Sequence, residues 1–414
     1  MKNEPHASST IGDLSQRLRA HDVSAVDIVD ACLARIDALN PRLNAFITVL
    51  ADGARERAQE ADRDIRAGNW RGPLHGVPVG IKDFYDTAGV RTTAAFERFK
   101  DRVPKQDAFA VTALQDAGAI VIGKTNMHRL GMGTTGLESA FGPAHNPWND
   151  AYVPGGSSSG SSVAVAAGLC YATLDTDAIG SCRLPAACCG NTGFKGTYGA
   201  ISSKGILDGE PVDQTILWYA HPGLTTRSAA DTAILLEALL QPDVRAKMPA
   251  SRDPNAAVPR LRIGVVENVN PAADVDRAFR SAVETLRNLG HQIGSAKAPF
   301  DMPPMGNLQS IEADRAAISN RAFKDVDMLV LPTLPTAVLP VDRARGNEQA
   351  LSPAHTMFAN YFGIPAISVP CGVDAQGLPI GLQIVGGPWD DSTILRLAAE
   401  YQAATDWHDR RPIA

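Results

Sequence analysis

The stretch SSVAVAAGLCYATLDTD, residues 161–177, carries the pattern that decides the fold. Its first half is small and apolar, as in a buried helix, and a glycine ends it. Its second half is a short apolar run typical of a buried strand. DAFAVTALQDAGAIVIGKTN, residues 107–126, repeats this pattern, and VDMLVLPT and PAISVPCG add β-branched runs bounded by proline and glycine. The alternation predicts an α/β fold with a mixed, mostly parallel central sheet covered by helices on both faces.

We expect the chain to form one large domain, because no internal repeat or low-complexity linker divides it. Helices are predicted near the N-terminus, where Ser24 is an N-cap candidate followed three residues later by an acid. A later segment has a weaker pattern, with one strand in RLRIGVV and one helix in VDRAFRSAVETLRNLG. The predicted parts are N-terminal helices over 1–65, a core over 73–240, a variable segment over 241–325 and the C-terminal part of the core over 326–414.

Composition excludes several classes of protein. The chain has 414 residues, of which 44% are hydrophobic, enough for a large core. Its net charge is −6 and its basic residues are scattered, so nucleic-acid binding has no electrostatic support. MKNEPHASST lacks the apolar region of a secretory signal, and no long apolar run predicts a membrane span. The six cysteines lack C-x-x-C spacing, so we expect reduced thiols, a cytoplasmic location, no metal and no cofactor.

The serine-rich loop VPGGSSSGSSVAVAAG, residues 153–168, permits three interpretations. Ser158 is central to a G-x-S-x-G match, which in an α/β-hydrolase would use His221 or His355. That motif needs a strand directly before it, and NPWNDAYVP contains two prolines and little apolar sequence. A phosphate-binding loop would need G-K-[ST], which residues 153–168 do not contain. A plain helix cap would use one or two of these serines.

A second stretch, TDAIGSCRLPAACCG at residues 176–190, resembles a nucleophile loop without a nearby base. It offers Ser181 and Cys182 as nucleophiles. The histidines nearest in sequence are His145 and His221. The group that accepts the proton must therefore come from elsewhere in the chain.

Several motifs in a fixed order resemble the amidase signature family over much of the chain. They are PLHGVPVGIKDFYDTAG, GAIVIGKTNMHRLGMG, SAFGPAHNPWN, the serine loop, GSCRLPAACCG, DMLVLPTLPT, YFGIPAISVPCG and GLPIGLQIVG. The resemblance implies the amidase signature fold and a Ser–Ser–Lys triad in place of histidine.

By this resemblance Ser181 is the nucleophile, Ser157 bridges after a cis Gly156–Ser157 bond, and Lys82 is the base. The chemistry is consistent, because serine needs a base and lysine is a base only when neutral, which burial favours. Lys82 follows the apolar run VPVGI, so we expect it to point inward. Ser157 would then pass the proton from Ser181 to Lys82.

The resemblance also places an oxyanion hole on the backbone N–H groups of Ala178, Ile179, Gly180 and Ser181. Ile179 departs from the family, where glycine is usual. A β-branched residue resists positive φ, so either this backbone is not left-handed or the loop differs from that of relatives.

Other residues near the loop have less specific roles. Asp177 and Arg183 are expected to orient the loop through hydrogen bonds. The cysteines of this region are expected to pack as small buried hydrophobes, and they are Cys182, Cys188 and Cys189.

Substrate-contacting residues are the least constrained by sequence. Met132 and Gly133 match a stretch that lines the acyl site in relatives, although Met132 also suits a core position. Trp218, Tyr219 and His221 either line an acyl pocket or pack within their loop.

The predicted function is hydrolysis of a small or medium amide through a seryl acyl-enzyme, with a small-molecule partner and with a homodimer left open. The short stretch after Leu240 suggests a compact member with a modest lid. The alternatives are hydrolysis of carbamates, ureides or esters by the same triad, a tRNA-dependent amidotransferase component that releases ammonia from glutamine, and a non-catalytic binding module.

Overall fold

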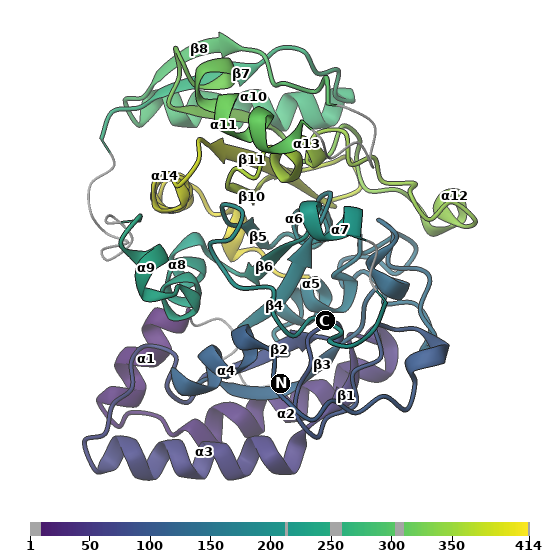
Figure 1. Ribbon diagram of the computed structural model, residues 1–414, viewed down its shortest axis with the longest axis vertical. Helices are drawn as coiled ribbons and strands as arrows, with labels where there is room; N and C mark the ends of the chain where they lie inside the picture. The colour runs from purple at the N-terminus through teal and green to yellow at the C-terminus, as the bar shows by residue number, and fades with distance from the viewer. Residues whose placement is uncertain (1–9, 212–213, 249–258, 303–309, 413–414) are drawn as a thin grey trace.

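Eleven strands join into one sheet in the computed structural model, which describes residues 10–211, 214–248, 259–302 and 310–412 (Figure 1). The strands are β1 Phe46–Val49, β2 Pro78–Lys82, β3 Ile120–Thr125, β4 Ala172–Asp177, β5 Thr192–Lys195, β6 His221–Thr226, β7 Arg262–Val266, β8 Gln292–Ala296, β9 Met328–Pro332, β10 Ala366–Val373 and β11 Pro379–Gly386. Their order across the sheet is β1-β3-β2-β4-β6-β5-β10-β11-β9-β7-β8.

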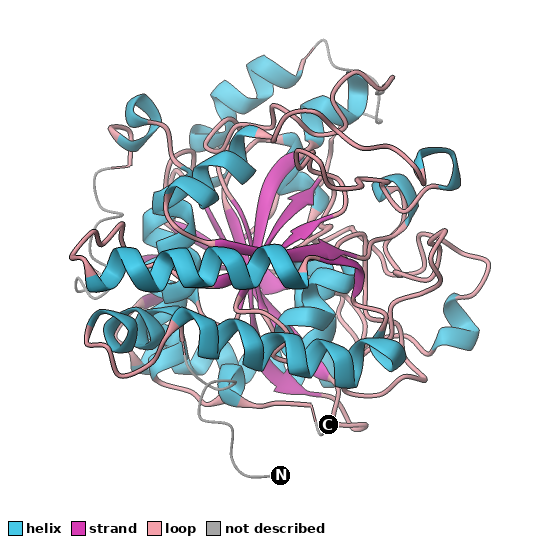
Figure 2. Ribbon diagram, turned by 90° about the horizontal axis from the view of Figure 1, so that it is seen from below, coloured by secondary structure: helices cyan, strands magenta, loops and turns pink. Residues whose placement is uncertain are grey.

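Helices surround this sheet on both faces (Figure 2). The α-helices are α1 Ile11–Arg19, α2 Ala25–Leu43, α3 Ala51–Arg66, α4 Phe109–Asp116, α5 Ser159–Ala166, α6 Arg183–Cys189, α7 Gln214–Tyr219, α8 Ala229–Leu239, α9 Pro242–Arg245, α10 Ala273–Asn288, α11 Ile311–Ala322, α12 Val341–Ala344, α13 Met357–Tyr361 and α14 Asp391–Ala403. Short 3-10 turns are η1 Glu97–Phe99, η2 Arg129–Gly131 and η3 Trp407–Asp409. In Figure 1, α1, α8 and α14 line one side of the sheet and α5 and α6 the other.

The predicted α/β fold with a mixed sheet is confirmed, but parallel pairs do not predominate in it. Among the described strands, β2–β3, β2–β4, β7–β8 and β7–β9 are parallel and the other six neighbouring pairs are antiparallel. The physical reason is that an apolar run identifies a strand but not the direction in which its neighbours pair. A parallel neighbour requires a crossover helix, whereas a short loop such as 374–378 returns β10 directly into β11 as an antiparallel neighbour.

α2 begins directly after Ser24, the predicted N-cap, and α1 begins directly after Thr10. The side chains of Thr10 and Ser24 each accept a hydrogen bond from the backbone N–H three residues later. The carboxylates of Asp13 and Asp27 in turn accept the backbone N–H of the capping residue. Both are capping boxes, which satisfy N–H groups that the helix leaves unpaired. The expected run of helices is interrupted by one short strand, β1, which pairs antiparallel with β3.

The variable segment holds more regular structure than its pattern indicates. Its predicted strand and helix are β7 and α10, and α10 buries Val275, Phe279 and Leu286. The segment also contains β8, α9 and α11, of which β8 lies at the edge of the sheet with mostly exposed residues. An exposed edge strand lacks the apolar alternation that identifies strands from sequence.

The unit α5–β4–α6 positions the serine and nucleophile loops. All residues of these three elements are buried. α5 consists of small residues and valines, and α6 is small and apolar after Arg183, whose charge is paired with Asp177. Fully burying a side chain such as Val163 or Leu174 contributes about 1.5–3 kcal/mol. Gly160 allows the close approach of α5, since a Cβ there would lie 2.3 Å from the Ala45 carbonyl oxygen and 2.6 Å from Asn126 backbone atoms.

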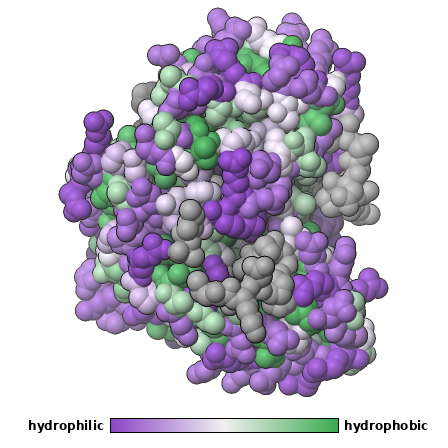
Figure 3. Space-filling model, turned by 180° about the vertical axis from the view of Figure 1, so that it is seen from behind, coloured by the Kyte–Doolittle hydropathy of each residue, from purple (hydrophilic) through white to green (hydrophobic). Residues whose placement is uncertain are grey.

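The surface seen in Figure 3 is mainly hydrophilic, with apolar residues scattered in small groups outside the grey atoms. Within the described ranges, no helix is both long enough and apolar enough to cross a membrane.

Gly160→Ala should destabilise the protein, because the added methyl group collides with the backbone at Ala45 and at Asn126. We expect a loss of about 1–3 kcal/mol in the free energy of unfolding, measured by chemical denaturation. The matched control is Gly53→Ala in α3, where a Cβ meets nothing within 4 Å and replacing a helical glycine should stabilise slightly. Equal stability of the two variants would contradict the packing described for α5.

Candidate active site

Lys82 ends the buried strand β2 and points into the protein, as its sequence context predicts. β2 lies between β3 and β4, and every residue of β2 is buried. The Lys82 Nζ lies 2.8 Å from Ser157 Oγ, 2.9 Å from Ser158 Oγ and 2.8 Å from Thr176 Oγ1. The amine therefore has three hydroxyl partners, two from the loop before α5 and one from β4.

Burial changes the acidity of this amine. Removal from water lowers the pKa of Lys82 to about 8, against the smaller opposing influence of Asp175, Cys182 and Asp177. Because the charged form is the one that burial disfavours, a substantial neutral fraction exists at mildly alkaline pH. Lys82 thus has the electrostatic property that a lysine base requires.

The serine loop carries Ser157 to the amine. The Gly156–Ser157 peptide bond is cis, as predicted. The Ser157 carbonyl accepts the His128 backbone N–H at 2.9 Å, and the Ser158 N–H donates to the Ser181 carbonyl at 3.0 Å. These backbone bonds connect the serine loop with the segment after β3 and with the nucleophile loop.

The loop 178–181 follows β4 directly. Gly180 has φ +129°, and a Cβ there would lie 2.4 Å from Thr356 Oγ1, so only glycine fits. Ile179 does not have positive φ, which answers the question that its β-branched side chain raises. Ala178 and Ile179 are half-buried, whereas Ser181 is buried.

One of the four predicted oxyanion donors, the Gly180 amide, is directed elsewhere. The Gly180 N–H donates to the Asp177 Oδ1 at 2.7 Å, so it is directed at a carboxylate. An amide held by a charged acceptor is not free to stabilise a second anion. The expected donors that remain are the amides of Ala178, Ile179 and Ser181.

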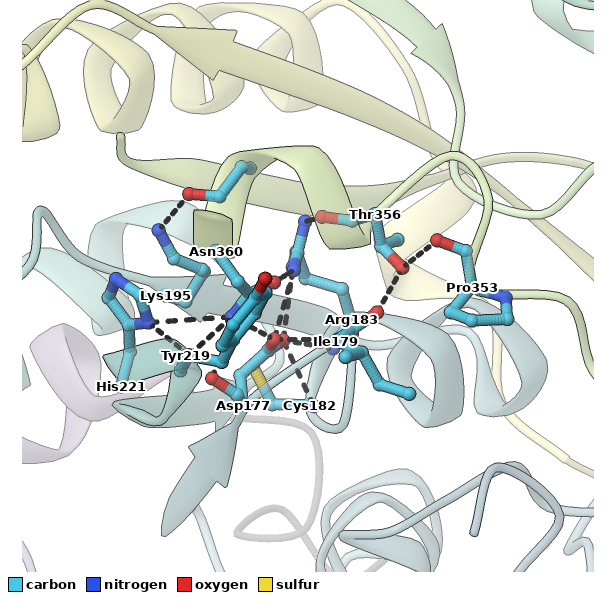
Figure 4. A network of polar contacts seen from close by, with 12 residues as sticks. Asp177, Ile179, Cys182, Arg183, Lys195, Tyr219, His221, Pro353, Thr356 and Asn360 are labelled. Carbon is cyan, nitrogen blue, oxygen red and sulfur yellow. Dashed lines mark hydrogen bonds and ion pairs between the residues drawn. The ribbon is translucent and has the colours of Figure 1, made fainter. Parts of the chain in front are cut away.

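Asp177 and Arg183 form a fully buried ion pair behind this loop (Figure 4). Arg183 Nη2 lies 2.9 Å from Asp177 Oδ1, and its Nε lies 3.0 Å from Oδ2. Burial by itself raises the pKa of Asp177, but Arg183 and hydrogen bonds from Asn360 outweigh burial and hold the pKa well below its usual range. The carboxylate is therefore charged at neutral pH, and it orients the loop through the Gly180 N–H and Arg183.

Sequence patterns do not identify the distant residues of this network. Arg183 donates to the Thr356 carbonyl at 3.0 Å and to Gln383 Oε1 and Asn360 Oδ1, each at 2.6 Å. The Thr356 hydroxyl donates to the Ile179 carbonyl. Asn360 directly precedes the motif YFGIPAISVPCG, which is the nearest sequence signal. Ser158 and Thr176, which contact Lys82, lie inside motifs already singled out.

Two of the predicted pocket residues follow η2, and the other three lie at the end of α7 and the start of β6. Met132 is 51% exposed, so it is not the core methionine that was the alternative, and Gly133 is buried against His128. Trp218 stacks on Tyr198, with ring centroids 6.5 Å apart, at the end of α7. Tyr219 and His221 are buried, and the His221 Nδ1 lies 2.8 Å from the Tyr219 carbonyl oxygen.

The contacts of Ser158 do not support the alternative in which it acts with His221 or His355. The Ser158 Oγ contacts Lys82 and the Thr176 carbonyl, whereas His355 Nδ1 faces the Pro332 carbonyl and His221 Nδ1 faces Tyr219 and Asn360. A strand directly before the loop is also missing among residues 126–158, all of which are described.

The cysteines are free and buried, consistent with their expected packing role. Burial raises the pKa of the Cys182 thiol, and the neighbouring Asp177 raises it further. A thiol with a raised pKa is a poor nucleophile at neutral pH. Across the described residues, no group of three or more His, Cys, Asp or Glu side chains could hold a metal ion.

Replacing Arg183 by methionine should strongly destabilise the protein, because Asp177 would remain charged and buried without its counterion. The expected loss is about 3–5 kcal/mol in the free energy of unfolding, measured by urea denaturation. Arg280→Met removes an exposed arginine that pairs with Asp276 and should leave stability almost unchanged. A small effect of Arg183→Met would show that the pair does not support the loop.

Comparison with known proteins gives this geometry a context. The Amidase family model matches residues 27–319 and 306–395. A glutamyl-tRNA(Gln) amidotransferase subunit from Roseiflexus sp. (strain RS-1) is 35% identical over 492 residues, covering 97% of this chain and 98% of the relative. The corresponding subunit from Geobacter metallireducens is 33% identical over 486 residues, with 97% and 98% covered.

Solved structures share the whole architecture. The structure of 6-aminohexanoate cyclic dimer hydrolase complexed with substrate has a TM-score of 0.85 and 25% identity, with 98% of this chain and 99% of that chain covered. The native peptide amidase from Stenotrophomonas maltophilia has a TM-score of 0.83 and 27% identity, with 99% of each chain covered. The chain has a mixed eleven-stranded sheet, a serine loop and a cis bond before Ser157. By its sequence and its architecture it belongs to the amidase family.

Proposed function

We propose that this protein hydrolyses a small or medium amide through a seryl acyl-enzyme, with Ser181 as nucleophile, Ser157 as relay and Lys82 as base. The observation that carries the proposal is the buried Lys82 amine, 2.8 Å from the Ser157 hydroxyl and with a pKa lowered to about 8 by burial. A neutral amine in contact with a serine hydroxyl can accept a proton that the hydroxyl passes on.

The hydrogen bonds favour Ser157 over Ser158 as the relay. A neutral amine donates two hydrogen bonds and accepts one, so one of its three hydroxyl partners must donate to it. The Ser158 hydroxyl donates to the Thr176 carbonyl at 3.3 Å and is therefore an acceptor toward Lys82. Among the described residues the Ser157 hydroxyl bonds only to Lys82, so in the proposed reaction it can donate to the amine and accept from Ser181.

In the proposed reaction the Ser181 Oγ attacks the amide carbon, and its proton moves through Ser157 to Lys82. The tetrahedral oxyanion is stabilised by amides of Ala178, Ile179 and Ser181, each worth about 3 kcal/mol in the transition state. Lys82 returns the proton through Ser157 to the leaving nitrogen, which departs as the amine. Water then attacks the acyl-enzyme, gives its proton to the same relay, and releases the carboxylic acid with Ser181 restored.

A second candidate follows from the named relatives, which are components of glutamyl-tRNA(Gln) amidotransferases. In that case the same triad would release ammonia from glutamine in a complex with partner chains. The aligned stretch spans 492 positions while this chain has 414 residues, so internal segments of that relative have no counterpart here. This difference favours a compact hydrolase. Glutaminase activity stimulated by tRNA and ATP, or co-purification with partner chains, would favour the amidotransferase.

Ser181→Ala should lower kcat/KM by at least about 10³-fold on any amide that the wild type hydrolyses. A panel of amides, carbamates, ureides and esters measured on both proteins identifies the substrate class. The matched control is Ser162→Ala in α5, whose buried hydroxyl has no hydrogen-bond partner among the described residues. Full activity of Ser181→Ala, together with loss in Cys182→Ala, would refute the proposed nucleophile.

The pH dependence should report the protonation of Lys82. Because only the neutral amine acts as base, kcat/KM should rise with pH and level off above about 8. Asp175 raises the pKa of Lys82, so Asp175→Asn should move the acid limb to lower pH. Lys82→Ala should abolish amide turnover at every pH. An acid limb that Asp175→Asn leaves in place or moves to higher pH would argue against Lys82 as the titrating group.

A further inference from the structure

The short helix α13 is hydrogen-bonded to the nucleophile loop at both of its ends. At the N-terminal end the Thr356 hydroxyl donates to the Ile179 carbonyl. Near the C-terminal end the Asn360 side-chain amide donates to the Asp177 carbonyl at 2.7 Å and to Asp177 Oδ1 at 3.0 Å. A shift of α13 therefore also shifts the backbone on which the nucleophile lies.

The C-terminal end of α13 closes in a Schellman motif. Gly363 has φ +65°, its N–H donates to the Asn360 carbonyl at 3.1 Å, and the Ile364 N–H donates to the Ala359 carbonyl at 3.1 Å. The motif uses one lone pair of each of these two carbonyls, and it does not pair the Tyr361 carbonyl. A helix of five residues is too short to persist by itself, so its position depends on tertiary contacts.

Lys195 provides the first of these contacts. It is the last residue of β5 and is completely buried beside the end of α13 (Figure 4). Its Nζ donates to the Ala359 carbonyl at 3.1 Å and to the Ile364 carbonyl. Burial lowers the pKa of Lys195 well below its usual value. A neutral amine keeps two N–H donors, as many as the carbonyls that it faces, so these bonds do not depend on charge.

Arg315 reaches the same helix end from α11. Its Nε donates to the Tyr361 carbonyl at 2.8 Å, and its Nη2 donates to the Asn360 carbonyl at 3.3 Å. Nη2 also donates to the Trp218 carbonyl at 2.6 Å, and Cζ lies 4.1 Å from the centre of the Tyr198 ring. Bonds to three carbonyls and an aromatic face hold the guanidinium in place. The carbonyls at the end of α13 thus have side-chain donors from two distant elements.

We propose that Lys195 and Arg315 are positioning residues that hold α13 against the nucleophile loop. They act through Thr356 and Asn360, which bond the loop directly. The effect on catalysis rests on the proposed function, because it supposes that Ser181 reacts with the substrate. The hold on the loop itself can be measured without activity.

Hydrogen exchange measures that hold. Lys195→Met and Arg315→Met remove the donors and keep a long side chain. In both variants, exchange in a peptide covering 176–190, divided by exchange in α2, should be several-fold faster than in the wild type, because the loop opens locally more often. The matched control is Leu286→Ala, which removes a buried side chain of α10 and destabilises the whole protein. Its exchange ratio should equal that of the wild type.

A fluorophosphonate measures the reactivity of the nucleophile without the natural substrate. In the labelling reaction the Ser181 Oγ forms a bond to phosphorus, fluoride leaves, and the proton passes through Ser157 to Lys82. Labelling should be about 10–100-fold slower in Lys195→Met and in Arg315→Met, because the reacting group is displaced. With an amide that the wild type hydrolyses, the loss should appear in kcat, with KM little changed.

Two further variants separate positioning from general stability. Arg315→Lys keeps a cation that can donate to these carbonyls but lacks the planar fork, so its labelling rate should lie between those of the wild type and Arg315→Met. Leu286→Ala should be labelled at the wild-type rate, because its effect on stability does not reach α13.

The outcomes are distinguishable from those that test the proposed function. Labelling at the wild-type rate in both methionine variants, an unchanged exchange ratio, or an equal loss in Leu286→Ala overturns the proposal. If Lys195→Met does not fold, Arg315→Met and Arg315→Lys decide, since Arg315 is only half-buried. Labelling that persists in Ser181→Ala, or a wild type that is not labelled, refutes the proposed nucleophile, and the exchange ratio then decides whether Lys195 and Arg315 hold the loop.

Discussion

The burial of the Lys82 amine is the interaction on which the site depends. An amine removed from water requires hydrogen-bond partners, and here three hydroxyls from two different elements provide them. The parallel pairing of β2 with β4 brings Ile81 level with Leu174, so Lys82 and Thr176 both lie at the carboxyl-terminal ends of these strands. The close packing of α5, permitted by Gly160, brings the serine loop to the same place. One buried amine therefore links strand register, helix packing and the acidity of the site.

A second buried charge, on Asp177, connects the two halves of the chain. Its counterion Arg183 also bonds to Thr356, Asn360 and Gln383, which belong to the C-terminal part. The proposed catalytic groups come from residues 82–181, but their backbone is oriented from residues 356–383. These contacts join the loop after β4 to the C-terminal part of the chain. Both halves of the chain therefore contribute to the network around Asp177, whereas the partners of Lys82 all come from residues 82–176.

The fold could be predicted largely from local signals, and the site only in part. The capping boxes at Thr10 and Ser24 and the buried runs that became β3 and β4 depend on neighbouring residues, so their patterns are visible in sequence. The expectation of mostly parallel strands failed because apolar patterns identify strands but do not give the direction in which neighbouring strands pair. The direction of the Gly180 amide toward Asp177 could not be predicted, because it depends on backbone dihedrals in a loop.

The sequence by itself determined the alternation of helices and strands, the family resemblance, and the identity of Lys82, Ser157 and Ser181 as the residues to examine. These features depend on residue type and spacing, which the chain displays directly. Only the tertiary structure decided that Lys82 has three hydroxyl partners, that Ile179 avoids a left-handed backbone, and that Thr356, Asn360 and Gln383 hold the nucleophile loop. The physical reason is that burial and hydrogen bonding are properties of atoms brought together from distant parts of the chain.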